Sequence, residues 1–299
     1  MELILREGQR ILAGKTLATI QMFAPISGSM GHGRHHLDKG FHAARITCTD
    51  GTSAAIFIDC TGPSPVVLPV AKSGTAIVPG STATSVGTPS GNAFGSAAFT
   101  ATLSTGPALV FSNQQNDGSH VNRIAVRRGD AIAPGLAWYA FRDPLMNAEG
   151  AAAWLGQISG ATAADNDVLA FTTDGGTPAI IAREGVAAPG TGSVFHSFTS
   201  VALPDGATGP LFSAVLRVGT GAVTTANDTG LWAVSSSGQI VLLLREGDAF
   251  GSRVILRIQA IEYVGGSPGQ ARSYNSTNSV IALLTFTDGS QSIVRADIP

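Results

Sequence analysis

Asp143 lies at the end of a strand-like segment that the sequence indicates as the innermost of its unit, and Glu262 lies in the corresponding segment of the last unit. A pair of carboxyl groups separated by about 5–10 Å can act as general acid and as base or nucleophile in glycoside hydrolysis. If the two groups face each other across a channel, the chain is a glycan-cleaving enzyme. Asp143 also precedes Pro144, and an Asp-Pro pair is common in turns, so a structural role is the alternative.

A histidine cluster is the second candidate for chemistry. His32, His35 and His36 lie in a Gly-rich segment that has no counterpart elsewhere in the chain. Imidazoles this close in sequence can bind zinc, copper or nickel. No carboxylate or cysteine is placed to complete a recognisable site, so a surface loop with adventitious metal affinity is the alternative. We therefore predict no cofactor.

Polar and aromatic residues beside predicted turns are the candidates for binding a saccharide. Carboxylate and amide oxygens accept hydrogen bonds from hydroxyl groups, and an aromatic ring offers a flat apolar face. The set comprises Asp130, Trp138, Glu184, Asn227, Asp228 and Asp248. Turn formation and Arg–Glu contacts between units explain most of the same residues, so a structural role is again the alternative.

Composition excludes several function classes. Of the 299 residues 44% are apolar and only 13% are charged, and the net charge is −2. A chain with this charge and only three lysines has no basic surface for nucleic acid. No apolar run is long enough to span a bilayer, and Glu2 and Arg6 interrupt the one run at the N-terminus, which therefore lacks the form of a signal peptide.

The two cysteines, Cys48 and Cys60, are predicted to be free thiols. The Asp50-Gly51 pair between two β-like runs indicates a hairpin turn. In the register that this turn sets, the two cysteines lie roughly 20 Å apart, which is beyond disulfide reach.

The chain repeats itself five times. Each copy begins with a short segment in which charged residues flank or precede a glycine, such as Arg183-Glu184-Gly185. A second glycine follows a few residues later, often as Pro-Gly, such as Pro189-Gly190. The glycines that mark the five copies, spaced by 55 to 66 residues, are Gly8, Gly74, Gly129, Gly185 and Gly247. Such a period indicates one supersecondary unit per repeat.

Each period contains about four strand-like segments, and 37 Gly and 15 Pro separate them. The fifth period has only three segments, whereas residues 2–7 form an extra one at the other end. We therefore predict an all-β, five-bladed β-propeller of four antiparallel strands per blade, in which residues 2–7 close the last blade beside residues 291–297. The expected blades of this single domain, 1–299, are 15–71, 80–128, 136–184, 192–246 and 252–298 plus 2–7. A two-domain β-sandwich is the alternative.

A second motif lies within the periods. Asn92-x-x-Gly95-x-x-Ala98-Phe99 has a close copy in Asn147-x-x-Gly150-x-x-Ala153-Trp154. Together with the Arg-Glu-Gly…Pro-Gly segments, this motif resembles the bacterial tandem-repeat family named for NxxGxxAF. The resemblance covers essentially the whole chain, and it implies a secreted or cell-surface protein without assigning a biochemical role.

The sequence thus favours an extracytoplasmic binding or adhesion module that recognises a polysaccharide or glycan. A glycan-cleaving enzyme with carboxylates in the central channel is the first alternative, and a purely structural surface protein is the second. The sequence does not define an oligomeric state.

Overall fold

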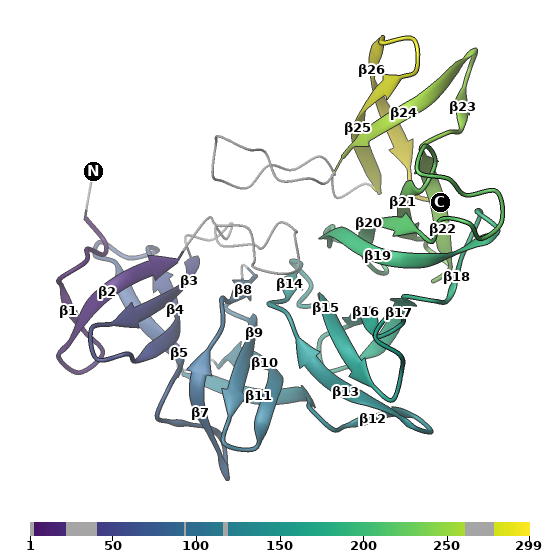
Figure 1. The fold of residues 1–299 in the computed structure, drawn as a ribbon. Helices are drawn as coiled ribbons and strands as arrows, with labels where there is room; N and C mark the ends of the chain where they lie inside the picture. The colour runs from purple at the N-terminus through teal and green to yellow at the C-terminus, as the bar shows by residue number, and fades with distance from the viewer. Residues whose placement is uncertain (1–2, 22–40, 93, 116–118, 261–277) are drawn as a thin grey trace.

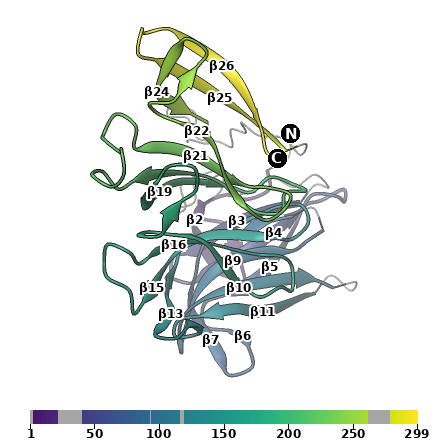
Figure 2. The same ribbon diagram turned by 90° about the vertical axis from the view of Figure 1, so that its right-hand side faces the viewer.

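The computed structural model describes residues 3–21, 41–92, 94–115, 119–260 and 278–299. These residues form five antiparallel sheets in chain order. Figure 1 shows the five sheets following one another around an arc, from the first sheet in purple to the fifth in yellow. Figure 2 shows the fifth sheet at one end of the molecule, next to the fourth. The sequence correctly predicted the all-β class and the number of units.

The first two sheets are built as follows. The first has the order β1-β2-β3-β4-β5, with strands β1 (Arg10–Ile11), β2 (Lys15–Gln21), β3 (Phe41–Cys48), β4 (Ser53–Asp59) and β5 (Val66–Lys72). The second has the order β11-β10-β9-β7-β6, with β8 also paired to β9, and its strands are β6 (Ala76–Val78), β7 (Ser81–Val86), β8 (Ser90–Gly91), β9 (Ala97–Leu103), β10 (Gly106–Gln114) and β11 (His120–Arg127).

The other three sheets repeat this plan. The third has the order β12-β13-β15-β16-β17, with β14 paired to β15, and its strands are β12 (Ala131–Ala133), β13 (Leu136–Phe141), β14 (Leu145–Met146), β15 (Ala152–Ser159), β16 (Asp167–Thr172) and β17 (Ala179–Arg183). The fourth contains, in order, β18 (Ala187–Ala188), β19 (Ser193–Ala202), β20 (Leu211–Leu216), β21 (Thr229–Val234) and β22 (Ile240–Arg245). The fifth contains, in order, β23 (Ala249–Phe250), β24 (Arg253–Gln259), β25 (Ser279–Phe286) and β26 (Gln291–Asp297).

The marker glycines occupy the same place in all five units. Each has a positive φ, for example +81° at Gly74, which a residue without a Cβ adopts without strain. Each donates its backbone N–H to the carbonyl of the first long strand that follows, and the five bonds are Gly8 to Leu17 (2.8 Å), Gly74 to Ala83 (2.7 Å), Gly129 to Trp138 (2.8 Å), Gly185 to Phe195 (2.9 Å) and Gly247 to Ile255 (2.8 Å). The glycines therefore fix the entry of the chain into each sheet.

The core lies between successive sheets. Along β3, Ala43 faces the second sheet and Ala44 faces the opposite way, as the period of two in a strand requires. Phe57 and Phe99 meet between the first and second sheets, while Phe111 and Trp154 meet between the second and third. Burial of both faces explains why these strands are nearly continuous apolar runs.

Larger aromatic groups fill the junction between the third and fourth sheets. Phe195, Phe212 and Trp232 pack there with ring centroids 5.2 to 6.0 Å apart, and all three are at most 1% exposed. Val280 and Leu231 join the fourth sheet to the fifth. Packed clusters thus connect each sheet to the next along the chain.

The structure does not show the predicted closing strand. Residues 3–6 belong to no strand, and within the described residues β26 pairs with β25 alone. Ile4 and Leu5 instead pack against the outward face of the first sheet, beside Ile11 and Val67. Burying these two apolar side chains on the nearest apolar face removes them from water without closing a ring.

Both cysteines are free, as the hairpin register predicted. Cys48 is buried and Cys60 is partly buried. The β3–β4 hairpin turns at Asp50-Gly51, with Thr47 opposite Ser53.

Candidate functional site

Asp143 is the one predicted catalytic residue that the structure places, and it lies just beyond the end of β13. Its carboxylate accepts a hydrogen bond from the Thr100 hydroxyl, which comes from the second sheet. It also accepts one from the backbone N–H of Thr88, at 3.2 Å. The carboxylate is therefore fixed by two residues that are 43 and 55 positions away in the sequence.

Gly87 makes room for this carboxylate. A Cβ on Gly87 would overlap both the Asp143 carboxylate and the Thr100 hydroxyl. The backbone N–H of Gly87 donates to the Thr100 carbonyl at 2.7 Å, which holds the segment against β9. The absence of a side chain at residue 87 is thus what allows Asp143 to lie against the second sheet.

Burial raises the pKa of the Asp143 carboxyl group above its usual range. The removal of water is the largest contribution. The hydrogen bonds from Thr100 and Thr88 and the nearby charge of Arg45 act in the opposite direction. Asp143 is therefore a carboxyl group with a raised pKa and fixed hydrogen-bond donors, a combination that is frequent in functional sites.

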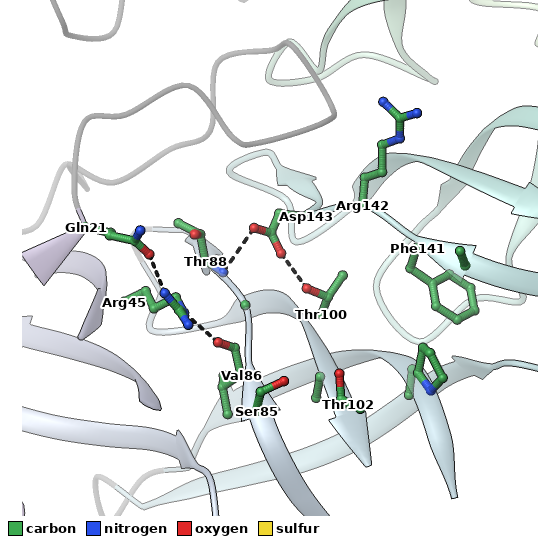
Figure 3. Close-up of a pocket in the computed structure, with 15 residues that line it drawn as sticks. Gln21, Arg45, Ser85, Val86, Thr88, Thr100, Thr102, Phe141, Arg142 and Asp143 are labelled. Atoms are coloured by element: carbon green, nitrogen blue, oxygen red, sulfur yellow. Dashed lines mark hydrogen bonds between the residues drawn. The ribbon is translucent and has the colours of Figure 1, made fainter. Parts of the chain in front are cut away.

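Asp143 lines a pocket of about 510 Å³ between the first three sheets. Figure 3 shows how its polar groups face this space from three units. Gln21 and Arg45 come from the first sheet, Thr88 and Thr100 from the second. The volume is in the range that holds a small ligand.

Two arginines give the pocket positive charge. The Arg45 guanidinium donates to the Val86 carbonyl at 2.7 Å and to Oε1 of Gln21 at 2.6 Å. Arg142 is partly exposed, and its guanidinium lies 3.6 Å from the Asp167 carboxylate. In Figure 3 its side chain points away from Asp143.

The wall of the pocket also has an aromatic part. Phe141 lines it and packs behind against Trp138, with 5.7 Å between the ring centroids. A carboxylate, a guanidinium and a carboxamide offer planar sets of donors and acceptors, while the phenyl ring offers an apolar face. This combination suits a ligand that carries several hydroxyl groups on a carbon skeleton.

The remaining predicted catalytic and metal-binding residues lie outside the described residues. These are Glu262, His32, His35 and His36. Within the described ranges, no three His, Cys, Asp or Glu side chains gather as a metal site would require. The carboxylate pair and the metal site therefore remain predictions.

The structure does not bring the predicted saccharide-binding set together with Asp143. The turn at Pro134-Gly135 lies before β13, and Asp143 lies beyond its other end. Asp130 and Asn227 fold their side chains back onto their own turns, where Asp130 accepts from Arg127 N–H (2.7 Å) and Asn227 from Thr224 N–H (2.7 Å). Asp228 lies in the loop between β20 and β21, and Asp248 lies in the turn between β22 and β23, next to the marker glycine Gly247.

The turns that hold the marker glycines lie at the same end of the molecule as the loops between the second and third long strands of each unit. A Cβ on Gly185 would overlap Asp165, and a Cβ on Gly247 would lie 2.5 Å from the Asn227 side chain. Arg217 ties this end across the junction of two units, because its guanidinium donates to Asp165 at 2.8 Å. This ion pair joins two units, but its acidic partner is an aspartate and not the glutamate of the predicted Arg–Glu contacts.

Trp138, the aromatic residue of the predicted saccharide-binding set, is buried. The residue is only 4% exposed, since its ring packs against Phe141 and Trp154. Its neighbour Tyr139 points outward instead and is 43% exposed, with the Arg128 guanidinium 4.2 Å from its ring centroid. Alternation along β13 explains the exchange.

Glu184 is buried rather than presented to a ligand. It is 7% exposed, and its carboxylate accepts a hydrogen bond from the Asp167 N–H at 3.3 Å. Burial, followed by the charge of Asp167, raises the pKa of Glu184 to about 7. The sequence predicted neither the burial of Glu184 nor the roles of Arg45, Thr88 and Thr100 in the pocket. These three residues come together only through the packing between units, which the sequence does not reveal.

The fold and the pocket define a repeat protein of five antiparallel sheets with a polar pocket between its first three units. A family model matches residues 2–297, and the chain belongs to that family, which is described as a family of unknown function (DUF7453). No curated protein matches the chain. No helix in the described part of the chain has the length and apolar character needed to cross a bilayer.

Proposed function

We propose that this protein is an extracytoplasmic carbohydrate-binding module and that the pocket around Asp143 holds the glycan. The supporting observation is the carboxylate of Asp143, held by Thr100 and Thr88 in a 510 Å³ pocket. Arg45 and Gln21 add further planar polar groups, and Phe141 adds an apolar face. Hydrogen bonds from ligand hydroxyls to fixed planar groups give both affinity and orientation.

A glycan-cleaving enzyme is the second candidate, and the raised pKa of Asp143 favours it. A carboxyl group with this property can act as a general acid. Hydrolysis with two carboxyl groups needs a second one within about 10 Å. Among the described residues that line the pocket, Asp143 is the only carboxylate, so this candidate depends on Glu262.

The location outside the cytoplasm is also part of the proposal. It rests on the NxxGxxAF-type repeats, which resemble those of exported or surface proteins. Fractionation of the native cells with an antibody against the protein tests it, and recovery in the soluble cytoplasmic fraction alone would contradict it.

We further propose that the five sheets are the blades of a β-propeller that closes between the first and fifth sheets. The outward face of the fifth sheet exposes Ile281 (53%) and Ile293 (76%), and the edge of β26 has no partner among the described residues. Apolar faces and free edges of this kind favour association with another strand. In the closed ring, residues 2–7 pair with β26, and Ile4 and Leu5 leave the first sheet.

Distance measurement between spin labels tests the closed ring. With Cys48→Ala and Cys60→Ser as background, labels at Leu3→Cys and Ser292→Cys are expected within about 20 Å, because paired strands lie about 5 Å apart. A single long distance would contradict closure in solution.

Glycan-array screening followed by calorimetry tests the binding function. The wild type is expected to bind at least one glycan, and Asp143→Asn to weaken that binding by about tenfold or more, whereas Asp130→Asn at the marker end leaves it unchanged. Release of reducing ends is measured in the same mixtures. Turnover that disappears in Asp143→Asn supports the enzyme, and absence of both binding and turnover in the wild type supports a structural role.

A further inference from the structure

Lys72 lies between two hollows of opposite character at the junction of the first and second sheets. On one side is a polar hollow of about 390 Å³, lined by Lys15, Asp50, Thr52 and Ser73. On the other side is an apolar hollow of about 350 Å³, whose walls are formed by Leu12, Ala13, Pro69, Val70 and Ala71. Lys72 and Thr75 line both.

The chain contains only three lysines, and two of them line the polar hollow. They are not equivalent. The Lys15 ammonium group is neutralised, because it pairs with the Asp50 carboxylate and also donates to the Thr52 hydroxyl at 2.9 Å. Lys72 makes no side-chain hydrogen bond or ion pair with any residue that the structure describes. Its charge is therefore available to a ligand.

The equivalent arginine of the fourth unit is held by a neighbouring loop, unlike Lys72. The corresponding Arg245 donates its Nε–H to the Asn227 carbonyl at 2.9 Å, which binds it to the neighbouring loop. The residue after Lys72 is Ser73, whereas Glu184 and Glu246 occupy this position at the last two junctions, between the third and fourth and between the fourth and fifth sheets. The junction of the first two sheets thus has the cation without the acidic residue of the repeat.

The turn beside the apolar hollow is also unlike its counterparts. Leu12 and Ala13 have φ values of 46° and 64°, in the left-handed region that side chains with a Cβ rarely adopt. The matching turns of the next three units use Pro79-Gly80, Pro134-Gly135 and Pro189-Gly190. Backbone strain of this kind persists where the surroundings enforce it and is frequent at ligand sites.

We propose that this junction binds a soluble monocarboxylate with an aliphatic chain. The carboxylate pairs with the Lys72 ammonium group, with the Ser73 hydroxyl as a second donor. The aliphatic chain lies in the hollow between Leu12 and Val70, where it is removed from water. An ion pair alone at such a partly exposed position is weak, so the apolar hollow supplies the rest of the affinity.

This site is independent of the glycan pocket. Lys15, which lines the polar hollow, is the first residue of β2, and Gln21, which lines the glycan pocket, is the last. The two sites therefore lie at opposite ends of the same strand. Failure of one proposal leaves the other unaffected.

Calorimetric titration with three probes tests the proposal. Sodium octanoate is expected to bind the wild type. Acetate, which lacks the aliphatic chain, and octanol, which lacks the charge, are each expected to bind with an affinity at least about tenfold lower. Lys72→Gln is expected to weaken octanoate binding about tenfold, and Lys72→Arg to retain it within about threefold. Arg295→Gln, on the fifth sheet, is the matched control and is expected to bind like the wild type.

A thermal melt confirms that each variant is folded before titration. The proposal is overturned if Lys72→Gln binds octanoate as the wild type does, or if octanoate does not bind at all. Equal binding of acetate and octanoate would show an anion site without the apolar part. Binding to anionic phospholipid vesicles but not to octanoate would show a membrane surface instead of a soluble ligand, and it also overturns the proposal.

Discussion

The side-chain amide of Asn92 donates a hydrogen bond to the backbone carbonyl of Ala148, 3.3 Å away in the next unit. Asn147 does the same toward the carbonyl of Pro204, also at 3.3 Å. The Oδ1 atom of each asparagine meanwhile accepts N–H groups of its own turn, from Ser96 in one case and Ala151 in the other. The asparagine of the repeated motif therefore both shapes a turn and joins consecutive units.

Replacing Asn147 tests this double role. Asn147 is 1% exposed, so Asn147→Ala leaves buried partners without hydrogen bonds at two places. The expected loss is about 2–4 kcal/mol in the free energy of unfolding, measured by urea denaturation. The partly exposed Asn166 provides the control, with less than about 0.5 kcal/mol lost in Asn166→Ala. Equal losses in both variants would contradict the role in joining units.

A methyl group at residue 87 is predicted to disrupt the pocket. In Gly87→Ala the new Cβ overlaps the Asp143 carboxylate and the Thr100 hydroxyl, so β7 or Asp143 must move. We expect about 2 kcal/mol of destabilisation and loss of glycan binding. Gly62→Ala is the matched control, since the nearest atom to its Cβ, the carbonyl oxygen of Ser64, is 3.8 Å away. Unchanged glycan affinity in Gly87→Ala would argue against this pocket as the site.

Glu184 is predicted to make stability fall as the pH rises. Its pKa is about 7 in the folded protein, against 4.5 for an ordinary glutamate, so the folded state binds the proton more tightly. Between about pH 4.5 and pH 7 the free energy of unfolding therefore decreases, by at most about 1.4 kcal/mol per pH unit from this group.

Urea denaturation of Glu184→Gln over that pH interval measures the effect. The variant is expected to lose this part of the pH dependence, whereas Asn166→Ala, which removes no ionisable group, keeps the wild-type profile. A Glu184→Gln profile parallel to that of the wild type would show that this carboxyl group does not titrate as described.

Two of the buried indoles, those of Trp154 and Trp232, are predicted to differ. Both Trp154 and Trp232 are fully buried, but only Trp232 has a partner for its Nε1–H, the Pro189 carbonyl at 3.1 Å. The Nε1–H of Trp154 is buried with no hydrogen-bond partner. Trp232→Phe should therefore cost about 1–2 kcal/mol more than Trp154→Phe in thermal or urea unfolding. The reverse order would contradict this assignment.

The repeated strands could be predicted because their signals are local. Turn glycines and short apolar runs define the third unit, which the sequence indicated over 136–184, and in the structure its strands β13 to β17 run from Leu136 to Arg183. A positive φ at the marker positions strongly favours glycine, so the markers are visible in one sequence.

The candidate site could be predicted only in part. Asp143 follows a strand and is recognisable as a carboxylate near the inner end of a unit. Its partners are the backbone N–H of Thr88 and the hydroxyl group of Thr100, neither of which stands out in a sequence. Only the packing of the second sheet against the third brings these two groups to the Asp143 carboxylate. Nor does alternation fix which face of β13 is buried, so the sequence alone did not show that Trp138 is buried and Tyr139 exposed.

Hydrogen exchange with and without a bound glycan tests the central claim most directly. The glycan selected on the array is added at saturating concentration, and the exchange of backbone amides is followed along the chain. We predict slower exchange in residues 85–88, 100–102 and 140–143, which line the Asp143 pocket. Slower exchange at the marker turns, with none in these three segments, would contradict the assignment of the pocket as the glycan site.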